Sequence, residues 1–410
     1  MNDAIKHNTA CRICGNKDFV KILDLGAMPP ANAFLREADL AKEEQKFPLV
    51  VYFCEKCFLL QLLDVVNPEI LFGEYDYVTS ASRPLAEHFE KSAIALVQRF
   101  NVNKSDLVIE IGGNDGVLLS AIKDQCRTLN IEPARIIAKL SEERGIPTIN
   151  SFFTSKEAEN VLKKHGGAAL VLANNVMAHI DNIQDAFIGV KKLIGERGVF
   201  VFEVHWVGNL ISEGGFDQIY HEHLCYHALH DLDYLAKSVG LRIFDVERIP
   251  IHGESLRVYV GKNNEALPAV ADFLRHEEEL GLTKAKTYLK FAEKVEKGKE
   301  AFKKILGDLK ESGKTIVGYG APAKGNTLLN YYEVTTGLVS FLTDTTPPKQ
   351  GTYAPGTRIP VVDPEAAKEN KPDYFLLLAW NYADAILKKE EEFRRNGGKF
   401  IIPVPEPRIV

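Results

Sequence analysis

The chain has 410 residues, of which 45% are hydrophobic and 26% charged, an ordinary composition for a globular protein of two or three domains. Its 50 basic and 56 acidic residues leave a net charge of −6, which argues against a protein held mainly to a nucleic-acid backbone. No apolar run reaches the length of a membrane span, and the N-terminus lacks the apolar core of a signal peptide. We therefore expect a cytoplasmic protein with no membrane contact.

Near the N-terminus, two C-x-x-C pairs are formed by Cys11 with Cys14 and by Cys54 with Cys57. A gap of two residues lets both thiolates of a pair reach one ion, so two pairs predict a closed, structural zinc site. Four buried reduced cysteines are the alternative. A redox pair fits less well because no thioredoxin-like βαβ pattern surrounds either motif, and the flanking residues are not unusually basic for a nucleic-acid-binding finger.

Beyond the second pair, Tyr75 and Tyr77 are spaced to point the same way on an extended segment, and Ser80 follows them. These residues are candidates for substrate contact, although a linker with packing tyrosines fits the pattern equally well. A helix is expected over Pro84–Phe100.

An apolar strand at residues 107–111 then runs into a glycine-rich turn and a helix at Val117–Asp124. The glycines let a ligand approach the backbone at the helix N-terminus, but their spacing does not match the dinucleotide fingerprint. Glu110 would repel a pyrophosphate and suits a cation, and Glu132, after a second strand, could hold a ribose diol. This combination predicts S-adenosylmethionine. The expected cofactor-binding residues are Glu110, Gly112, Asn114, Asp115, Gly116, Glu132, Asn174 and Asn175.

Alternating strands and helices continue to residue 260 and indicate a mostly parallel sheet covered on both faces. We expect strands at Ala168–Ala173, Gly198–Val204, Leu241–Ile249 and Ser255–Val260, and helices at Ser155–Gly166, Asn182–Ile194 and Asp231–Gly240. The last two strands are close enough for an antiparallel hairpin. His179 follows the first of these strands at its carboxyl end, as a site candidate or as a capping or core histidine.

The segment Phe216–His227 concentrates chemistry, with three of the eleven histidines, two tyrosines and two carboxylates in twelve residues. Such a cluster can supply a base, an acid and an orienting partner near neutral pH. It lies beyond the carboxyl end of a strand, where open α/β sheets bind ligands. A polar surface turn or a partial metal site is the alternative.

Long charged helices follow at Asn264–Gly313, and then a third unit that begins with Gly318-Tyr319-Gly320. This turn formally matches G-x-G-x-x-A between a strand and a helix, with Asp344 closing the next strand (Leu338–Thr343). Lys324 and backbone amides could instead hold a phosphate or carboxylate. Strands at Tyr374–Trp380 and Phe400–Pro403 complete a small α/β domain.

Taken together, these motifs resemble the sugar C-methyltransferases that act on nucleotide-activated keto-deoxysugars. The likeness spans nearly the whole chain. It is carried by the cysteine pairs and by Tyr75-x-Tyr77-x-x-Ser80, Glu110-x-Gly112-x-Asn114-Asp115-Gly116, Asn175-x-x-x-His179-Ile180, Phe216–His223, His252-Gly253, Gly318–Ala321 and Ala379-Trp380-Asn381. Gly113 stands where a cysteine is common in that family, and His221 where histidine and aspartate alternate.

The resemblance implies an α/β chain with a zinc-binding domain (residues 1–70), a class I methyltransferase domain (71–263), and a helical linker with a Rossmann-like domain that uses no nicotinamide (264–410). It also implies a nucleotide-sugar substrate lodged between domains. We expect no nucleic-acid partner. We also expect the protein to be a monomer or a dimer. The expected substrate-binding residues are Tyr77, Ser80, His221, His252, Tyr319, Lys324 and Lys349.

The chemistry requires a carbonyl, because a C–H bond beside sugar hydroxyls is not acidic enough for a side chain to break. We therefore expect a 4-keto sugar that loses its C3 proton and is then methylated. His223 is the expected base, Tyr220 and Glu222 would position it or bind the sugar, and His179 or Tyr75 would donate to the enolate oxygen. The alternatives are a nicotinamide-dependent oxidoreductase or epimerase, a methyltransferase acting on RNA, and a non-enzymatic scaffold.

Overall fold

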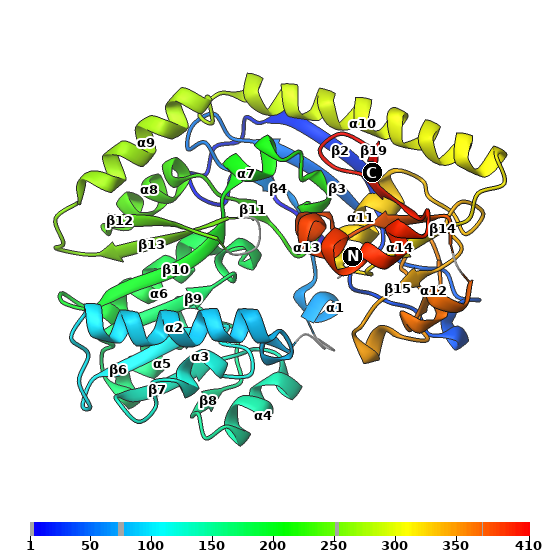
Figure 1. The fold of residues 1–410 in the computed structure, drawn as a ribbon. Coiled ribbons are helices and arrows are strands. Elements are labelled where there is room, and N and C mark those ends of the chain that lie inside the picture. Colours follow the sequence, from blue (N-terminus) through cyan, green and yellow to red (C-terminus); the bar gives the residue numbers. More distant parts are fainter. Residues whose placement is uncertain (1–3, 73–77, 251–253, 371) are drawn as a thin grey trace. The chain divides into compact units, whose positions relative to one another are not determined.

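The computed structural model describes residues 4–72, 78–250, 254–370 and 372–410, which form two compact units (Figure 1). Unit 1 comprises Met1–Val20, Phe53–Val207 and Leu224–Lys284, and unit 2 comprises Lys21–Tyr52, Gly208–His223 and Ala285–Val410. Both units are assembled from separated segments of the chain, whereas the expected domains were continuous. The division at residues 70 and 263 stays a prediction.

Unit 1 is built on a seven-stranded sheet in which the last two strands of the unit, β12 (Arg242–Ile249) and β13 (Ser255–Gly261), occupy one edge. In spatial order the strands are β12, β13, β10 (Val199–His205), β9 (Leu170–Asn174), β6 (Leu107–Ile111), β7 (Arg127–Ile131) and β8 (Thr148–Ile149). All pairings are parallel except those of β13, which is antiparallel to both β10 and β12. The expected parallel sheet with an antiparallel hairpin is confirmed.

Two helices of this unit begin at a side-chain cap. The Thr154 side chain accepts a hydrogen bond from Glu157 N ahead of α5, and the Asn182 side chain accepts one from Asp185 N ahead of α6, so both caps satisfy orphan amides. The helices are α2 (Arg83–Arg99), α3 (Val117–Ser120), α4 (Arg135–Glu143), α5 (Ser155–His165), α6 (Ile183–Ile194), α8 (Leu229–Ser238) and α9 (Pro268–Leu280). The α-helix after the glycine turn, α3, is therefore shorter than expected.

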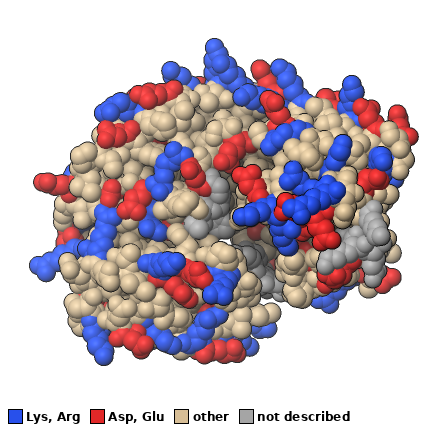
Figure 2. All heavy atoms as spheres, in the orientation of Figure 1, with Lys and Arg blue, Asp and Glu red and all other residues tan. Residues whose placement is uncertain are grey.

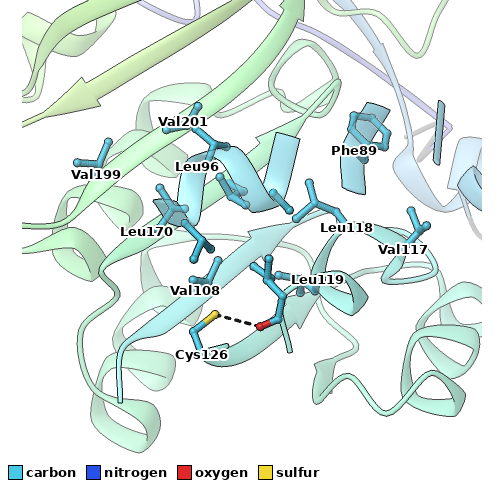
Figure 3. Close-up of a cluster of buried hydrophobic side chains, with 14 of the residues drawn as sticks. Phe89, Leu96, Val108, Val117, Leu118, Leu119, Cys126, Leu170, Val199 and Val201 are labelled. Carbon is cyan, nitrogen blue, oxygen red and sulfur yellow. Dashed lines mark hydrogen bonds between the residues drawn. The ribbon is translucent and has the colours of Figure 1, made fainter. Parts of the chain in front are cut away.

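One buried apolar cluster holds α2 against the sheet (Figure 3). Phe89 and Leu96 of α2 belong to one cluster with Val108 of β6 and Leu170 of β9, and both strands are buried on both faces. Parallel strands covered on both sides need such continuous apolar runs. The packing therefore fixes the strand ends that carry the glycine turn.

Short strands complete unit 1 around its N-terminal segment. β1 (Ile5–His7) pairs antiparallel with β5 (Asp64–Val66), and β4 (Leu60–Leu62) pairs antiparallel with β11 (Cys225–Tyr226). The helix α1 (Pro68–Phe72) follows β5.

Unit 2 contains a second, six-stranded sheet, as expected for a Rossmann-like C-terminal domain. Its order is β16 (Val361–Val362), β15 (Leu342–Thr343), β14 (Ile316–Tyr319), β17 (Tyr374–Leu377), β18 (Lys399–Ile402) and β19 (Arg408–Ile409), with only β19 antiparallel. Its helices are α11 (Ala323–Tyr331), α12 (Glu365–Asn370), α13 (Ala383–Lys389) and α14 (Glu391–Arg395). The neighbouring strands β2 (Val20–Met28) and β3 (Phe47–Phe53) and the 27-residue α10 (Ala285–Glu311) also lie largely in this unit; Figure 1 shows α10 running along β2.

Two expected strands of this unit are shorter than the sequence indicated. Only Leu342–Thr343 of Leu338–Thr343 is a strand, and the strand that begins at Tyr374 ends at Leu377. Trp380 instead opens a 3₁₀ turn (Trp380–Tyr382), which places its indole outside the sheet. Leu378 and Trp380 are buried in the loop after Leu377, so periodicity alone does not separate this loop from a longer strand. Before Leu342, Val339 is buried and Ser340 is exposed.

In the described part of the chain, none of the helices is long and apolar enough to cross a bilayer. Acidic and basic side chains are interspersed over the face drawn in Figure 2.

Candidate functional site

The two cysteine motifs adopt the same backbone turn. Gly15 N donates to Cys11 O at 2.9 Å, and Phe58 N donates to Cys54 O at 2.8 Å. Gly15 and Phe58 both have a left-handed backbone, with φ of 67° and 66°. Such a turn brings the two cysteines of a motif together, as a zinc knuckle requires.

The four sulfur atoms meet as a ligand set. Cys11, Cys14, Cys54 and Cys57 are free thiols whose Sγ atoms all lie within 4.8 Å of one another. The sulfurs of a tetrahedral zinc–thiolate site are about 3.8 Å apart, so the residues fit the ion. Gln61 Nε2 also donates to Cys11 Sγ at 3.2 Å, as the outer partners of metal ligands do. These cysteines hold a structural zinc ion.

Arg12, inside the first motif, connects this site to Leu224, which lies within Phe216–His227 just before β11. Its Nη1 donates to Leu62 O at 2.8 Å and to Leu224 O at 2.9 Å, and its Nη2 lies 3.3 Å from an Asp181 oxygen. Leu224 N in turn donates to Ala178 O at 2.8 Å. The sequence offered no sign of this role, because Arg12 and Leu224 are 212 residues apart.

The glycine turn after β6 depends on residues without side chains. Gly112 has φ of 63°, and a Cβ there would meet Val176 Cγ2 at 2.5 Å; Gly116 has φ of 73°, and its Cβ would meet Ser141 Oγ at 2.6 Å. Both the backbone conformation and the close approach therefore require glycine. At Gly113 a Cβ would meet Asn130 Oδ1 at 2.5 Å, so the cysteine common in the resembling family would need a shifted Asn130.

Glu110 places a buried carboxylate under this turn. Asn174 Nδ2 approaches its Oε1 at 3.5 Å, while Oε2 is buried with no hydrogen-bond partner among the described residues. Burial raises the pKa of Glu110 to about 8, and nearby acids raise it further against the Asn174 hydrogen bond. An orphaned carboxylate oxygen beside a glycine turn fits a cationic ligand, which would restore its charged form.

Glu132, at the end of β7, shapes the same turn. Its two oxygens accept hydrogen bonds from Asn114 N at 3.0 Å and Ala134 N at 2.9 Å, and burial raises its pKa. A carboxylate has about four acceptor positions, so Glu132 can still accept hydrogen bonds from the two hydroxyls of a ribose. Asn130 also supports the turn, because its Oδ1 accepts from Gly113 N at 3.0 Å.

The other expected cofactor and loop residues of unit 1 have varied surroundings. Asn175 has φ of 57° and a buried Oδ1 without a partner in the described chain, so it is available to a ligand. Asp115 is fully buried and paired with Arg144 at 2.7 Å, and Arg144 also donates to Ser80 Oγ. His179 ends a 3₁₀ turn (Met177–His179) after β9. Tyr75, Tyr77 and His252 lie outside the described residues.

In unit 2, the histidine-rich loop holds His223 in a defined tautomer. His223 Nδ1 lies 2.9 Å from Gln218 O, and because a carbonyl only accepts, Nδ1 carries the proton. Nε2 of the neutral ring is then the acceptor, and the Tyr220 hydroxyl lies 2.9 Å from it. The loop thus presents a basic nitrogen coupled to a phenol.

The residues beside His223 differ in environment. His221 is buried, and its Nε2 donates to Phe47 O at 3.0 Å, so this side chain ties the loop to β3. Glu222 is 3% exposed and accepts a hydrogen bond from Asn32 Nδ2 at 2.7 Å. Burial raises the pKa of Glu222 to about 7, against the lowering effect of Asn32. A carboxyl group with such a pKa can exchange protons at neutral pH.

A hydrogen bond that the sequence did not predict holds the start of the loop in place. Trp380 Nε1 donates to Asp217 Oδ2 at 2.6 Å, and both residues are buried. Burial raises the pKa of Asp217, although the Lys324 charge and the Trp380 hydrogen bond lower it. Both residues belong to motifs quoted above, but nothing in either motif indicates their pairing.

The glycine turn of unit 2 is surrounded by two lysines. Lys324 Nζ bonds Asn381 Oδ1 at 2.6 Å, Lys349 Nζ bonds Ala321 O at 2.8 Å, and no carboxylate within the described ranges lies at ion-pair distance from either. Burial lowers the pKa of both. Tyr319 is engaged elsewhere, since its hydroxyl donates to Glu390 at 2.8 Å. Asp344 accepts from Ala321 N at 2.8 Å and so occupies one of the turn's amides.

The sheet order of unit 1, with its glycine turn flanked by Glu110 and Glu132, defines a class I S-adenosylmethionine-dependent methyltransferase. Comparison with known proteins supports this class. Three family models match, described as a zinc-binding domain (residues 11–72), a methyltransferase domain (85–246) and a C-methyltransferase C-terminal domain (250–405).

The chain is also 38% identical over 414 residues to the C-methyltransferase NovU of Streptomyces niveus, covering 100% of this chain and 99% of that protein. It therefore belongs to the C-methyltransferase family and is an S-adenosylmethionine-dependent enzyme, as the resemblance predicted.

Among solved structures, an S-adenosylmethionine-dependent methyltransferase from Clostridium acetobutylicum matches with 14% identity and a TM-score of 0.35 over 47% of this chain and 95% of that chain. The O-methyltransferase NcsB1 matches with 14% identity and a TM-score of 0.31 over 46% and 62%.

Proposed function

We propose that this enzyme methylates C3 of a nucleotide-activated 4-keto-deoxysugar. Carbon–carbon bond formation needs a carbanion, and only a proton α to a carbonyl is acidic enough for a side chain to remove. The observation that carries the proposal is the fixed tautomer of His223, whose Nδ1 donates to Gln218 O and whose Nε2 is left basic. S-adenosylmethionine supplies the electrophilic methyl group.

In this proposal, His223 Nε2 takes the C3 proton, and the electrons of the broken C–H bond delocalise onto the sugar carbonyl as an enolate. Tyr220, 2.9 Å from Nε2, takes this proton as its own hydroxyl proton passes to solvent, which restores the base between turnovers. His179 or Tyr75 donates to the enolate oxygen. Glu222 binds a sugar hydroxyl. A positioned base and one oxyanion donor contribute about 10²–10⁴ and 10²–10³ in rate.

Lys324 and Lys349 hold the diphosphate of the nucleotide. Both ammonium groups contact neutral oxygens rather than carboxylates, so a phosphate oxygen can form a charge-assisted hydrogen bond with each. Burial lowers the pKa of both lysines, and the nearby charges of Asp217 on Lys324 and of Asp344 on Lys349 act in the opposite direction. Lys349→Met is expected to raise the KM for the nucleotide sugar about tenfold, with kcat within about twofold, because it removes binding shared by ground and transition states. An unchanged KM in steady-state kinetics would remove Lys349 from the site.

The function is tested by incubating the protein with methyl-labelled S-adenosylmethionine and a panel of dTDP-, GDP- and CDP-linked 4-keto-deoxyhexoses. Label is expected on a ring carbon of one of them, and none on the corresponding 4-hydroxy sugars. Label on oxygen, or on none of the keto sugars, would overturn the proposal.

Deuterium exchange separates the base from the transfer. In D₂O without S-adenosylmethionine, the C3 proton of the keto sugar should exchange in the presence of the wild-type protein and not with His223→Asn. Exchange at the wild-type rate in the variant would show that another group is the base.

A further inference from the structure

Glu222 is a buried carboxylate with few polar contacts. It is 3% exposed, and within the part of the chain that the structure describes, no Lys, Arg or His lies at ion-pair distance from it. Its recorded side-chain partner is the amide of Asn32, whose Nδ2 donates to Oε1 at 2.7 Å. An isolated buried carboxylate is costly, so this one hydrogen bond has a large influence on where the group points and on its charge.

Asn32 is itself held in place by its surroundings. Phe34 N donates to Asn32 O at 2.9 Å, and Ala33 N to Pro30 O at 3.1 Å, which closes a tight turn. On the other side, Asn326 Nδ2 donates to Ala31 O at 2.7 Å. Asn326 is 1% exposed and lies on α11, so the turn that carries Asn32 is braced against a helix of the same unit.

We propose that Asn32 is a positioning residue of the active site, which holds Glu222 Oε1 so that the carboxyl group meets the sugar in one orientation beside His223. The inference rests on the proposed function and adds to it a residue from the segment between the two cysteine pairs. The pKa of about 7 given to Glu222 by burial is consistent with a group that exchanges a proton with a sugar hydroxyl.

Two substitutions of Asn32 separate the hydrogen bond from packing. Asn32→Leu retains similar volume without a donor, and Asn32→Gln retains a donor on a longer arm. We expect kcat to fall about 10- to 100-fold in Asn32→Leu and less in Asn32→Gln. The KM for S-adenosylmethionine should stay within about twofold, since the contact acts on Glu222 and not on the cofactor turn. Equal losses in both variants, or an unchanged kcat, would overturn the inference.

A double-mutant cycle tests whether Asn32 acts through Glu222. In a Glu222→Met background, Asn32→Leu should lower kcat by less than about twofold, because methionine offers no carboxyl or amide oxygen for Asn32 to hold. Multiplying effects would show that Asn32 acts independently and would overturn the inference.

A control variant and a second readout keep this test distinct from that of the proposed function. Asn330→Ala removes an amide of the same kind, which donates to the backbone oxygens of Asn326 and Pro355; it should lower stability and leave kcat unchanged. If the wild-type protein methylates none of the keto sugars, the proposed function fails. In that case the same double-mutant cycle, measured as free energies of unfolding, tests whether Asn32 and Glu222 interact. A coupling free energy of zero between them would overturn the inference.

Discussion

Binding of S-adenosylmethionine is expected to release a proton from Glu110. Burial raises the pKa of this carboxyl group to about 8, so in the free protein at pH 7 it is protonated in about nine molecules of ten. Its Oε2 is buried without a partner among the described residues, at the glycine turn where we expect the cationic cofactor to bind. A neighbouring positive charge lowers a carboxyl pKa by about 1–3 units, which favours the ionised form.

The magnitude follows from these two states. If the bound pKa is about 6, binding at pH 7 releases about 0.8 of a proton, and at pH 9 the release falls to about 0.1. The sign is that of a carboxyl group protonated in the free state and ionised in the complex. The dissociation constant should therefore fall as pH rises, by up to about tenfold per unit between pH 6 and 8, and level off above pH 8.

Titration calorimetry in phosphate and in Tris, whose ionisation enthalpies differ, measures the number of protons released. The cofactor's own amine also titrates, so Glu110→Gln is the reference: it should bind more weakly and show no Glu110-dependent release. Glu159→Gln, which changes an exposed acid on α5, should behave like the wild type. A binding enthalpy independent of buffer in the wild-type protein at pH 7, or a pH profile that Glu110→Gln leaves unaltered, would refute the reasoning.

Three further outcomes are expected. His223→Asn should lower turnover about 10²- to 10⁴-fold in a methyl-transfer assay, while the dissociation constant of S-adenosylmethionine stays within about twofold. Cys14→Ser should lose zinc by metal analysis and lower the melting temperature, because metal binding contributes to folding. Arg12→Gln should keep zinc but lower the free energy of unfolding by about 1–3 kcal/mol in urea denaturation, since the carbonyls of Leu62 and Leu224 lose their buried donor.

A specific result would contradict each of these predictions. Full activity in His223→Asn would remove the base assignment, and stoichiometric zinc in Cys14→Ser would show a different ligand set. For Arg12, Lys6→Gln is the matched control: it also removes a cation from Asp181, but from an exposed position, and should change stability by less than about 1 kcal/mol. Equal effects of the two variants would mean that the backbone contacts of Arg12 contribute nothing.

Much of the local chemistry could be predicted from the sequence because it depends on spacing along the chain. A C-x-x-C motif brings two sulfurs together in one turn, and both motifs form that turn. Glycines at positions 112 and 116 predicted the turn after β6, and both have the positive φ that favours glycine. Apolar runs separated by helical patterns predicted the parallel sheet. Errors concerned the ends of elements, such as Tyr374–Trp380, where burial of the following loop resembled a longer strand, and the helix after the glycine turn, which ends at Ser120.

The amino-acid sequence by itself determined the zinc ligands, the cofactor turn and the alternation of strands and helices, since each is encoded in short-range patterns. Only the tertiary structure decided which partners hold the reactive loop. Asn32 meets Glu222 across 190 residues of sequence, and Trp380 meets Asp217 across 163. The same structure gathers Gly208–His223 with Lys21–Tyr52 in one compact unit, where the sequence had assigned them to different domains. Hydrogen-bond partners this far apart leave no periodic pattern, because their pairing depends on how the chain folds back and not on the spacing of residue types.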